Sequence, residues 1–392
     1  MLLRRCSALL IQPREQREFD LDSLLRGGDG TATRLQWIAL APHLEHELVL
    51  DAPDVLLLGD VSETRWVDRT ALAEAHGAQR VDALLARGLL IGDDATHAAM
   101  RERDERQREA HWHPLAAALQ TFGRWRDVDS SDALTQTGLR TLGDLVRQLG
   151  PPPPHVQVRG TADTRVSLPR PSTSALEALM QRRTTCRNFD RASTLPLADC
   201  AALMHRVFAA QAVIEPAPGA AIMKKTSPSG GGLHATEAYL LVQRVEGIEP
   251  GLYHYHAVDH ALQPLPCAAP DEESLRALAR RCVAGQHWFG DAHVLVMLVP
   301  RFARSFWKYR NHAKAYRALI LDVGHLSQTL YLGATELGLG AFVTAAINEV
   351  EIEQAFGLDP QAESPLAVCG FGSRGAEKAT VEFDPLGQVW PR

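Results

Sequence analysis

The sequence predicts an α+β protein of two domains, and three observations support this fold class. A chain of 392 residues and 43.0 kDa is long enough for two domains with separate hydrophobic cores. Four consecutive prolines, Pro151–Pro154, cannot continue a helix and mark a boundary. Helical and strand patterns follow one another on both sides of that boundary. We expect an N-terminal domain at residues 1–150, a proline-rich linker at 151–171 and a larger domain at 172–392.

The N-terminal domain is predicted to contain a small helical unit. Apolar runs at residues 37–60 predict short strands around a proline-containing turn. Amphipathic patterns at 70–76 and 78–87, joined at Gly77, predict two helices, and residues 88–91 predict a strand. This order resembles a winged helix-turn-helix. Residues 1–150 contain 18 arginines, no lysine and 24 acidic residues, so their net charge is negative and disfavours DNA binding. Docking of a peptide or a partner protein fits this charge better.

The second domain alternates helices and strands. We expect Ser172 or Thr173 to cap a helix at 175–183, because serine and threonine side chains accept hydrogen bonds from the first turn. Residues 251–256 and 261–265 should pair as a hairpin. The continuously apolar stretch 293–299 predicts a central strand. The remaining predicted elements are helices at 197–211 and 271–284 and strands at 239–242 and 367–370.

The segment Trp307–Ile347 is the most informative part of the chain. After Lys308 and Tyr309, apolar positions recur at helical spacing for about thirty residues without proline, which predicts one long buried helix. Gly338 and Gly340 should end it, because glycine enters the left-handed region without a Cβ penalty. Residues 341–347 are small or apolar, so their backbone could lie flat against a planar ligand. Taken alone, such a helix is more often plain hydrophobic core.

The cysteines and the apolar runs of the sequence indicate the cellular compartment of the protein. The six cysteines form no C-x-x-C pair, so the sequence suggests neither a zinc site nor a disulfide framework, and we expect no metal. The apolar run at the N-terminus is too short for a signal peptide, and no run is long enough to span a membrane. These features are typical of a cytoplasmic protein.

Three further segments could bind a phosphorylated, planar ligand. If the backbone is extended, Arg183, Thr185 and Arg187 alternate and share one side, as a phosphate and its ribityl neighbour would require. Glycines 230–232 follow Ser229 and allow close approach of backbone to a ligand, with amides free to donate. Arg374 leaves a glycine-rich turn and could complete the phosphate site. Taken alone, the arginine segment could also be a solvated cluster, the glycine segment a flexible loop and the Arg374 segment a surface turn.

Together, these ordered segments closely resemble the nitroreductase-fold, FMN-dependent dehydrogenases of peptide-modifying gene clusters. The resemblance rests on R-x-T-x-R-x-F, PSGGGLH, PGLYHYHAVDHALQPL and the segment from Trp307 to Phe342, and it covers about residues 172–375. It implies a nitroreductase-like fold, in which helices flank a central, mainly antiparallel sheet. Its known members oxidise thiazolines and oxazolines in ribosomally made peptides, as in the streptolysin-type and microcin-type pathways.

The resemblance also assigns roles to residues. It implies that Arg183, Thr185 and Arg187 contact the FMN phosphate and ribityl, with Arg374 as the C-terminal phosphate contact. Two further groups would line the flavin and its isoalloxazine ring, respectively: Ser229, Gly230 and Gly231, and Thr344, Ala345 and Ala346. Lys308 and Tyr309 match the pair regarded as catalytic in azoline-oxidising members. Ala235 stands where many relatives have proline, and Thr185 stands where serine is frequent.

The expected function is therefore FMN-dependent dehydrogenation of a ribosomally made precursor peptide, converting azolines to azoles. Expected partners are the precursor peptide, a cyclodehydratase or other maturation enzyme, and a second copy of the chain, because the fold usually binds flavin at a two-fold interface. Two alternatives stay open. One is an NAD(P)H-dependent flavin reductase of quinones or nitroaromatics, and the other is a non-enzymatic winged-helix regulator.

Overall fold

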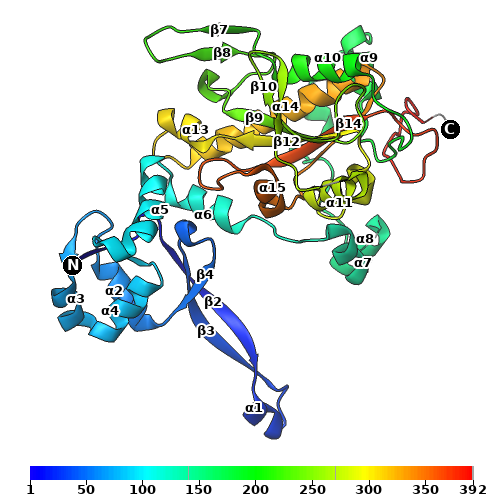
Figure 1. Ribbon diagram of the computed structural model, residues 1–392. Coiled ribbons are helices and arrows are strands. Elements are labelled where there is room, and N and C mark those ends of the chain that lie inside the picture. The colour runs from blue at the N-terminus through cyan, green and yellow to red at the C-terminus, as the bar shows by residue number, and fades with distance from the viewer. Residues whose placement is uncertain (140, 270, 391–392) are drawn as a thin grey trace. The chain divides into compact units, whose positions relative to one another are not determined.

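The computed structural model describes residues 1–139, 141–269 and 271–390. The chain forms two compact units (Figure 1). Unit 1 contains Met1–Arg124, Arg301–Leu319 and Asp359–Glu363, and unit 2 contains Trp125–Pro300, Ile320–Leu358 and Ser364–Arg392. Residues 301–319 and 359–363 thus pack with the N-terminal part of the chain. The expected boundaries of the N-terminal domain at residue 150 and of the larger domain at residue 172 remain a prediction.

Unit 1 contains two small antiparallel sheets. In the first, β1 lies between β5 and β6, and in the second, β3 lies between β2 and β4. The long β2–β3 ribbon ends in the short helix α1. The strands are β1 (Leu2–Arg5), β2 (Leu10–Phe19), β3 (Thr31–Leu40), β4 (Glu47–Leu50), β5 (Val67–Asp68) and β6 (Leu90–Gly92). The helices up to residue 122 are α1 (Leu21–Leu25), α2 (Ala52–Asp60), α3 (Arg69–His76), α4 (Ala78–Ala86), α5 (Ala98–Glu109) and α6 (Pro114–Phe122).

The predicted helix pair is confirmed as α3 and α4, and the strand after it as β6. Gly77 joins the helices with φ of 90°, a conformation that side chains with a Cβ rarely adopt. The strand prediction for residues 37–60 is wrong after Leu50. Residues Ala52–Asp60 form α2 because Asp51 and Asp54 close a capping box at its start. A winged helix-turn-helix remains an interpretation of this part of the chain.

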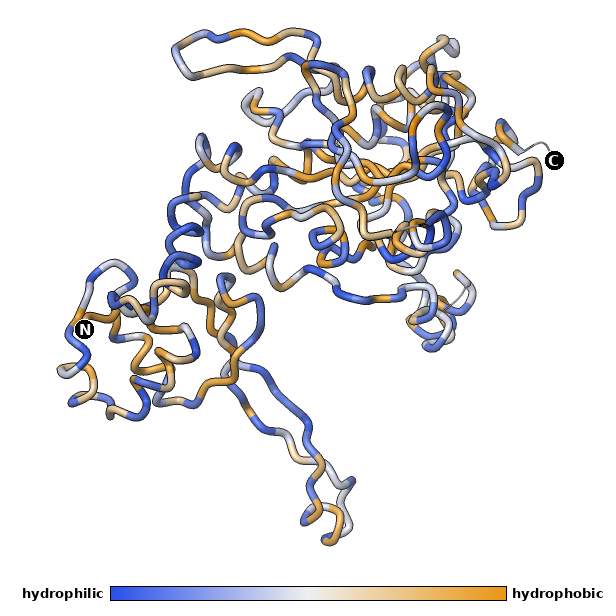
Figure 2. The backbone as a smooth tube through the Cα atoms, in the orientation of Figure 1, coloured by the Kyte–Doolittle hydropathy of each residue, from blue (hydrophilic) through white to orange (hydrophobic). Residues whose placement is uncertain are grey.

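Unit 2 is built on a six-stranded antiparallel sheet of order β11-β10-β9-β12-β14-β13. Side chains that alternate along each strand enter two cores. Leu240 and Val296 pack against α10 and α14 on one face, whereas Leu241 and Leu295 pack against α11, α12 and α15 on the other. The central strands are correspondingly hydrophobic in Figure 2. The expected fold, in which helices flank a mainly antiparallel sheet, is confirmed.

The predicted hairpin and central strand are present as β10, β11 and β12. The sheet strands are β9 (Thr236–Val242), β10 (Gly251–His256), β11 (Ala261–Leu265), β12 (Val294–Pro300), β13 (Gly340–Thr344) and β14 (Ala367–Gly372). A separate ribbon contains β7 (Ala212–Ile214) and β8 (Ile222–Lys224). The helices before residue 300 are α7 (Ser130–Gln136), α8 (Leu142–Leu149), α9 (Ala175–Arg182), α10 (Leu197–Phe208), α11 (Glu272–Cys282) and α12 (His287–Gly290), and α15 (Glu349–Phe356) follows β13. The cap of α9 is Ser174, since it closes a capping box with Glu177, and not Ser172 or Thr173.

The predicted long helix is present as α14, but Lys308 and Tyr309 do not begin it. Helix α13 (Phe302–Lys308) ends at Tyr309, and α14 (Lys314–Glu336) begins five residues later. Asn311 lies between them with φ of 53°, a left-handed conformation that asparagine tolerates better than most residues and that a helix cannot contain. Gly338 has φ of 73° just beyond α14, as predicted, and β13 follows it. Lys308 therefore ends a separate helix.

A buried histidine at the start of β12 predicts a pH dependence of stability. His293 is fully buried, and its Nε2 lies 3.0 Å from the carbonyl oxygen of Ser193. Burial, aided by Arg244, lowers the pKa of His293 from 6.5 to about 4. Between about pH 4 and pH 6.5, the unfolded chain therefore carries one more proton than the folded chain. The stability due to neutral His293 is therefore complete above about pH 6.5 and is lost as the pH falls toward 4.

We expect this loss to disappear in His293→Gln, which keeps a hydrogen-bond donor but does not titrate. Urea unfolding of both proteins at several pH values should show their stability difference changing by about 1.4 kcal/mol per pH unit between pH 6.5 and 5. Carboxylates titrate alike in both proteins and cancel in the difference. A difference that is constant with pH would contradict the assignment.

Candidate functional site

The segment Arg183–Phe189 has the predicted alternation. Arg183, Thr185 and Arg187 are partly exposed, and the residues between them, Thr184 and Cys186, are buried. The segment runs beside β13: the N–H of Cys186 donates to the carbonyl oxygen of Ala341 at 2.8 Å, and Thr185 forms a parallel bridge with Ala341. The three predicted side chains are therefore the partly exposed positions of a strand-like segment that the sheet holds in place.

Tyr331 of α14 connects this segment to β13, and sequence reasoning missed it. Its hydroxyl lies 3.0 Å from Thr185 Oγ1 and accepts a hydrogen bond from the N–H of Val343 at 3.1 Å. The guanidinium carbon of Arg183 lies 5.3 Å from the centre of its ring. Burial raises the pKa of Tyr331, so the hydroxyl stays protonated. In the sequence, Tyr331 is one more apolar position of a helix.

Tyr331→Phe removes both hydrogen bonds without removing the ring. We expect it to destabilise unit 2 by about 1–3 kcal/mol, because the Val343 N–H and the Thr185 hydroxyl lose a partner. Thermal or urea unfolding would measure the change. Tyr253→Phe, which loses a single hydrogen bond to the carbonyl oxygen of Glu249, is the matched control. A smaller loss in Tyr331→Phe than in this control would contradict the expectation.

The side chain of Gln286 holds the backbone strip Thr344–Ala346 at the end of β13. Gln286 Nε2 donates to Thr344 Oγ1 at 3.1 Å and to the carbonyl oxygen of Ala346 at 2.9 Å. Ala345 between them is exposed, and Thr344 and Ala346 are partly exposed. The strip is thus ordered by its own neighbours and presents small side chains outward, as a shelf for a planar ring would.

The glycine loop is more tightly bound than the sequence suggested. The side chain of Asp322 in α14 accepts from Ser229 Oγ at 2.6 Å and from the N–H of Gly230 at 2.9 Å. Gly231 and Gly232 have φ of 65° and 70°, which explains the need for glycine. The expectation that the loop amides are free is wrong for Gly230 and Gly232, because the N–H of Gly232 donates to the carbonyl oxygen of Ser229.

A small cavity that includes charged and hydroxyl-bearing residues in its lining lies beside this loop. Two charged side chains, Lys225 and Asp322, line it and are only 3% and 7% exposed. Thr236 is also buried there, and within the described residues its hydroxyl has no hydrogen-bond partner. This set could not be predicted from the sequence, because Lys225 and Asp322 are nearly a hundred positions apart. Charged groups buried so close to the loop are candidates for changing the affinity or the reactivity of a ligand bound there.

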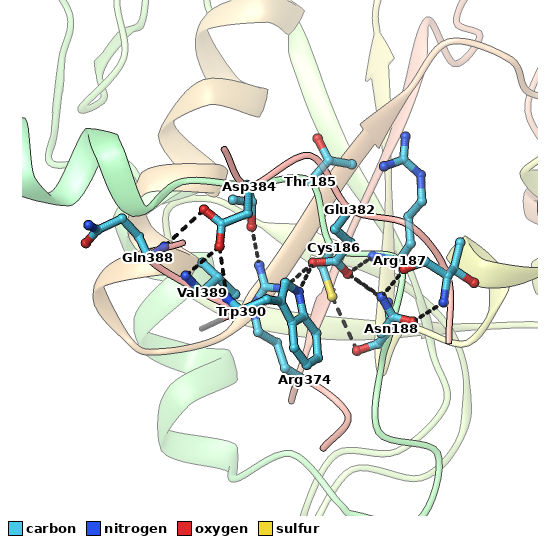
Figure 3. Close-up of polar contacts among 12 residues, drawn as sticks. Thr185, Cys186, Arg187, Asn188, Arg374, Glu382, Asp384, Gln388, Val389 and Trp390 are labelled. Carbon is cyan, nitrogen blue, oxygen red and sulfur yellow. Dashed lines mark hydrogen bonds and ion pairs between the residues drawn. The ribbon is translucent and has the colours of Figure 1, made fainter. Parts of the chain in front are cut away.

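Arg374 reaches the Arg183–Phe189 segment from its buried side. Its Nη2 donates to Thr184 Oγ1 at 2.9 Å, and its Nη1 forms an ion pair with Glu382 at 2.8 Å (Figure 3). Arg183, Thr185 and Arg187 are the partly exposed positions of the segment, and Arg187 Nη1 donates to the carbonyl oxygen of Val381 at 3.4 Å. The structure therefore brings Arg374 to the predicted segment, but toward a carboxylate of the same chain.

The predicted catalytic pair belongs to unit 1. Lys308 is exposed at the end of α13, and its Nζ lies 5.7 Å from the centre of the Tyr309 ring. Helix α13 is fixed within unit 1 by aromatic packing, since Trp112 lies 4.6 Å and 4.5 Å from Phe302 and Phe306 between ring centres. The other predicted site residues all belong to unit 2.

No group of three or more His, Cys, Asp or Glu side chains within the described residues is arranged to hold a metal ion. Of the helices in the same residues, none combines the length and apolar character needed to cross a membrane.

Comparisons with known proteins agree with this fold. Residues 179–373 match the model of the nitroreductase family. The chain is 32% identical over 149 residues to the trifolitoxin-processing protein TfxB of Rhizobium leguminosarum bv. trifolii, covering 37% of this chain and 38% of TfxB. It is 27% identical over 168 residues to the microcin B17-processing protein McbC of Escherichia coli, covering 42% of this chain and 58% of McbC. The matches thus span less than two thirds of either relative.

A solved structure is also similar. A chain of the E. coli microcin synthetase McbBCD complex with truncated pro-MccB17 bound aligns with a TM-score of 0.46 and 22% identity, covering 69% of this chain and 97% of that chain. The family match, the six-stranded antiparallel sheet and the helices on its two faces agree with one another. Residues 179–373 of this chain are therefore a domain of the nitroreductase family.

Proposed function

We propose that this chain is an FMN-dependent oxidoreductase that dehydrogenates a ribosomally made precursor peptide, converting azolines to azoles. One observation carries the proposal: Arg183, Thr185 and Arg187 are the partly exposed positions of a segment that is bonded to β13, and β13 leads into the strip at Thr344–Ala346. Residues suited to a phosphate and a strip suited to a planar ring thus adjoin the same sheet edge. The processing roles in the names of TfxB and McbC support a peptide as the substrate.

The residues present fit FMN. Arg183 and Arg187 supply positive charge and planar donors for a phosphate, and the Thr185 hydroxyl suits the phosphate or the neighbouring ribityl chain. Ser229, Gly230 and Gly231 would line the flavin, with the loop fixed by Asp322. The backbone of Thr344, Ala345 and Ala346 would lie against the isoalloxazine ring. Arg374 would support the phosphate end through Thr184.

When bound, FMN would accept a hydride from carbon beside nitrogen or sulfur. The chain must then remove a proton from the azoline ring, and we assign this step to Lys308 as the base, with Tyr309 orienting the ring heteroatom. A lysine is a base only where its charge is suppressed by removal from water. Lys308 is exposed in the chain alone, so the assignment requires the bound peptide or a second copy of the chain to cover it.

We further propose that the N-terminal region, residues 1–150, docks the leader part of the precursor peptide or a partner maturation enzyme. Residues 1–150 carry an excess of acidic over basic side chains, which suits basic or neutral peptides and disfavours nucleic acid. A homodimer would complete the enzyme.

The purified protein tests the proposal directly. Its absorbance spectrum should show bound flavin, and incubation with the genomically adjacent precursor peptide carrying azolines should lower the peptide mass by about 2 Da per ring. Steady consumption of NAD(P)H without peptide would favour the quinone or nitro reductase instead. A colourless protein that leaves the peptide mass unchanged would refute the proposal.

A further inference from the structure

The last part of the described chain folds back onto the Arg183–Phe189 segment. We call residues 380–390 the C-terminal segment. Its attachment is reciprocal: Asn188 Nδ2 donates to the carbonyl oxygen of Thr380 at 2.8 Å, and the N–H of Thr380 donates to Asn188 Oδ1 at 2.6 Å. Asp384 closes the far end by accepting from the backbone N–H groups of residues 388–390 (Figure 3). The segment thus has a defined conformation although it contains neither helix nor strand.

Glu382 is the centre of this contact. Its side chain is fully buried and accepts five hydrogen bonds. Oε1 accepts from the backbone N–H groups of Arg187 and Asn188 at 2.5 Å and 3.0 Å and from Asn188 Nδ2 at 2.9 Å. Oε2 accepts from Arg374 Nη1 at 2.8 Å and from Trp390 Nε1 at 2.7 Å.

A buried carboxylate is stable only where such donors replace water. Burial alone would raise the pKa of Glu382, but the bonds from Trp390, Arg187 and Asn188 and the charge of Arg374 keep it below the ordinary value. The charge is therefore retained, and charge-assisted hydrogen bonds are the stronger kind. Glu382 fixes the backbone of Arg187 and Asn188 more firmly than neutral contacts would.

The side from which Glu382 acts is also defined. Thr184, Cys186 and Asn188 point to the buried side of the segment, where Arg374 and the C-terminal segment lie. Arg183, Thr185 and Arg187 are partly exposed, and Arg187 Nη1 donates to the carbonyl oxygen of Val381 in the C-terminal segment at 3.4 Å. The C-terminal segment can therefore hold both the backbone and the guanidinium of Arg187, while Arg183 and Thr185 stay partly exposed to a ligand.

We propose that Glu382 is a positioning residue for the phosphate end of the cofactor site. By bonding the amides of Arg187 and Asn188 and by pairing with Arg374, it sets the alignment of Arg183, Thr185 and Arg187 toward the phosphate. The proposal rests on the proposed binding of FMN. It adds the C-terminal segment to the cofactor site, although no residue of that segment would touch the flavin.

A direct contact between Arg374 and the phosphate would reverse the expected change in FMN affinity. If Arg374 were a direct phosphate ligand, Glu382 would compete with the phosphate for it, and removing the carboxylate charge would strengthen FMN binding. If Glu382 positions the segment, removing its charge weakens FMN binding. The sign of the change therefore decides between the two.

The test compares Glu382→Gln with Glu377→Gln, which makes the same change at an exposed position a few residues earlier. Binding of FMN and of riboflavin to the flavin-free full-length proteins would be followed by flavin fluorescence. Because riboflavin lacks the phosphate, its affinity should be nearly equal in all three proteins. The FMN affinity of Glu382→Gln should fall about tenfold or more, as loss of a charge-assisted anchor implies. Glu377→Gln should match the wild type.

Each result has one meaning. Wild-type protein that binds neither flavin overturns the proposed function and, with it, the role of Glu382. Wild-type protein that binds FMN while Glu382→Gln binds it equally or more tightly overturns the positioning role alone. An equal loss of FMN and riboflavin affinity, which general unfolding would cause, also overturns it. Glu382→Asp, which keeps the charge on a shorter side chain, should recover part of the FMN affinity if the variant with glutamine loses it.

Discussion

Lys308→Ala is expected to lower the rate of peptide oxidation by about 100- to 10,000-fold, the usual contribution of a positioned general base. FMN should stay bound, because the proposed cofactor contacts all belong to unit 2 and Lys308 belongs to unit 1. The fold should also survive, since Lys308 is exposed and its helix is anchored through Phe302 and Phe306. The measurement is the rate of mass loss of the precursor peptide together with the flavin absorbance of the purified variant.

Lys314→Ala is a suitable control for this experiment. Lys314 is the other exposed lysine of the region and begins α14. Its replacement should leave the rate within about a factor of two or three, as for most surface substitutions. Full activity in Lys308→Ala would rule out Lys308 as the base, whereas equal losses in both variants would point to a general need for positive charge on this surface.

The largest effect on stability is expected for Asp104→Ala in unit 1. Asp104 of α5 is fully buried, and its side chain forms an ion pair with Arg4 Nη1 at 2.6 Å. It also accepts from the N–H and the hydroxyl of Ser7 at 2.6 Å and 2.8 Å. Removing the carboxylate leaves the guanidinium of Arg4, which is 2% exposed, without its closest counter-charge. We expect a loss of about 3–5 kcal/mol in the free energy of unfolding.

Glu105→Ala separates this effect from general loss of charge on α5. Glu105 is 43% exposed and lies 3.6 Å from Arg4 Nη2, so its removal should cost about 1 kcal/mol or less. Urea unfolding followed by circular dichroism would give both values. Equal losses in the two variants would show that burial of Asp104 adds nothing, contrary to the expectation.

Much of the fold could be predicted because it depends on local periodicity. The β10–β11 hairpin, the apolar β12 and the α3–α4 pair follow from side chains that repeat at the spacing of their element. The alternation of Arg183, Thr185 and Arg187 was predictable for the same reason. The break before α14 was not, because residues 309–313 contain no proline or glycine, and a left-handed Asn311 leaves no periodic signal.

The supporting contacts of the candidate site could not be predicted, since they join residues far apart in the chain. Tyr331 bonds Thr185 across 146 positions, and Glu382 bonds Arg187 across 195. A tyrosine in an apolar helix and a glutamate near the C-terminus have no spacing that indicates such partners. The chemically reactive residue types could be listed from the sequence, whereas the groups that orient them required coordinates.

The division of unit 1 along the chain has a consequence for synthesis. Trp112 packs on Phe302 and Phe306, yet about 180 residues of unit 2 separate Arg124 from Arg301. At about 5–20 residues per second, a ribosome adds those residues in roughly 10–40 s. During that interval the indole of Trp112 lacks its aromatic partners, and the hydrophobic packing of unit 1 stays incomplete. The newly made N-terminal part of the chain therefore exposes a hydrophobic surface that a chaperone could bind until residue 306 emerges.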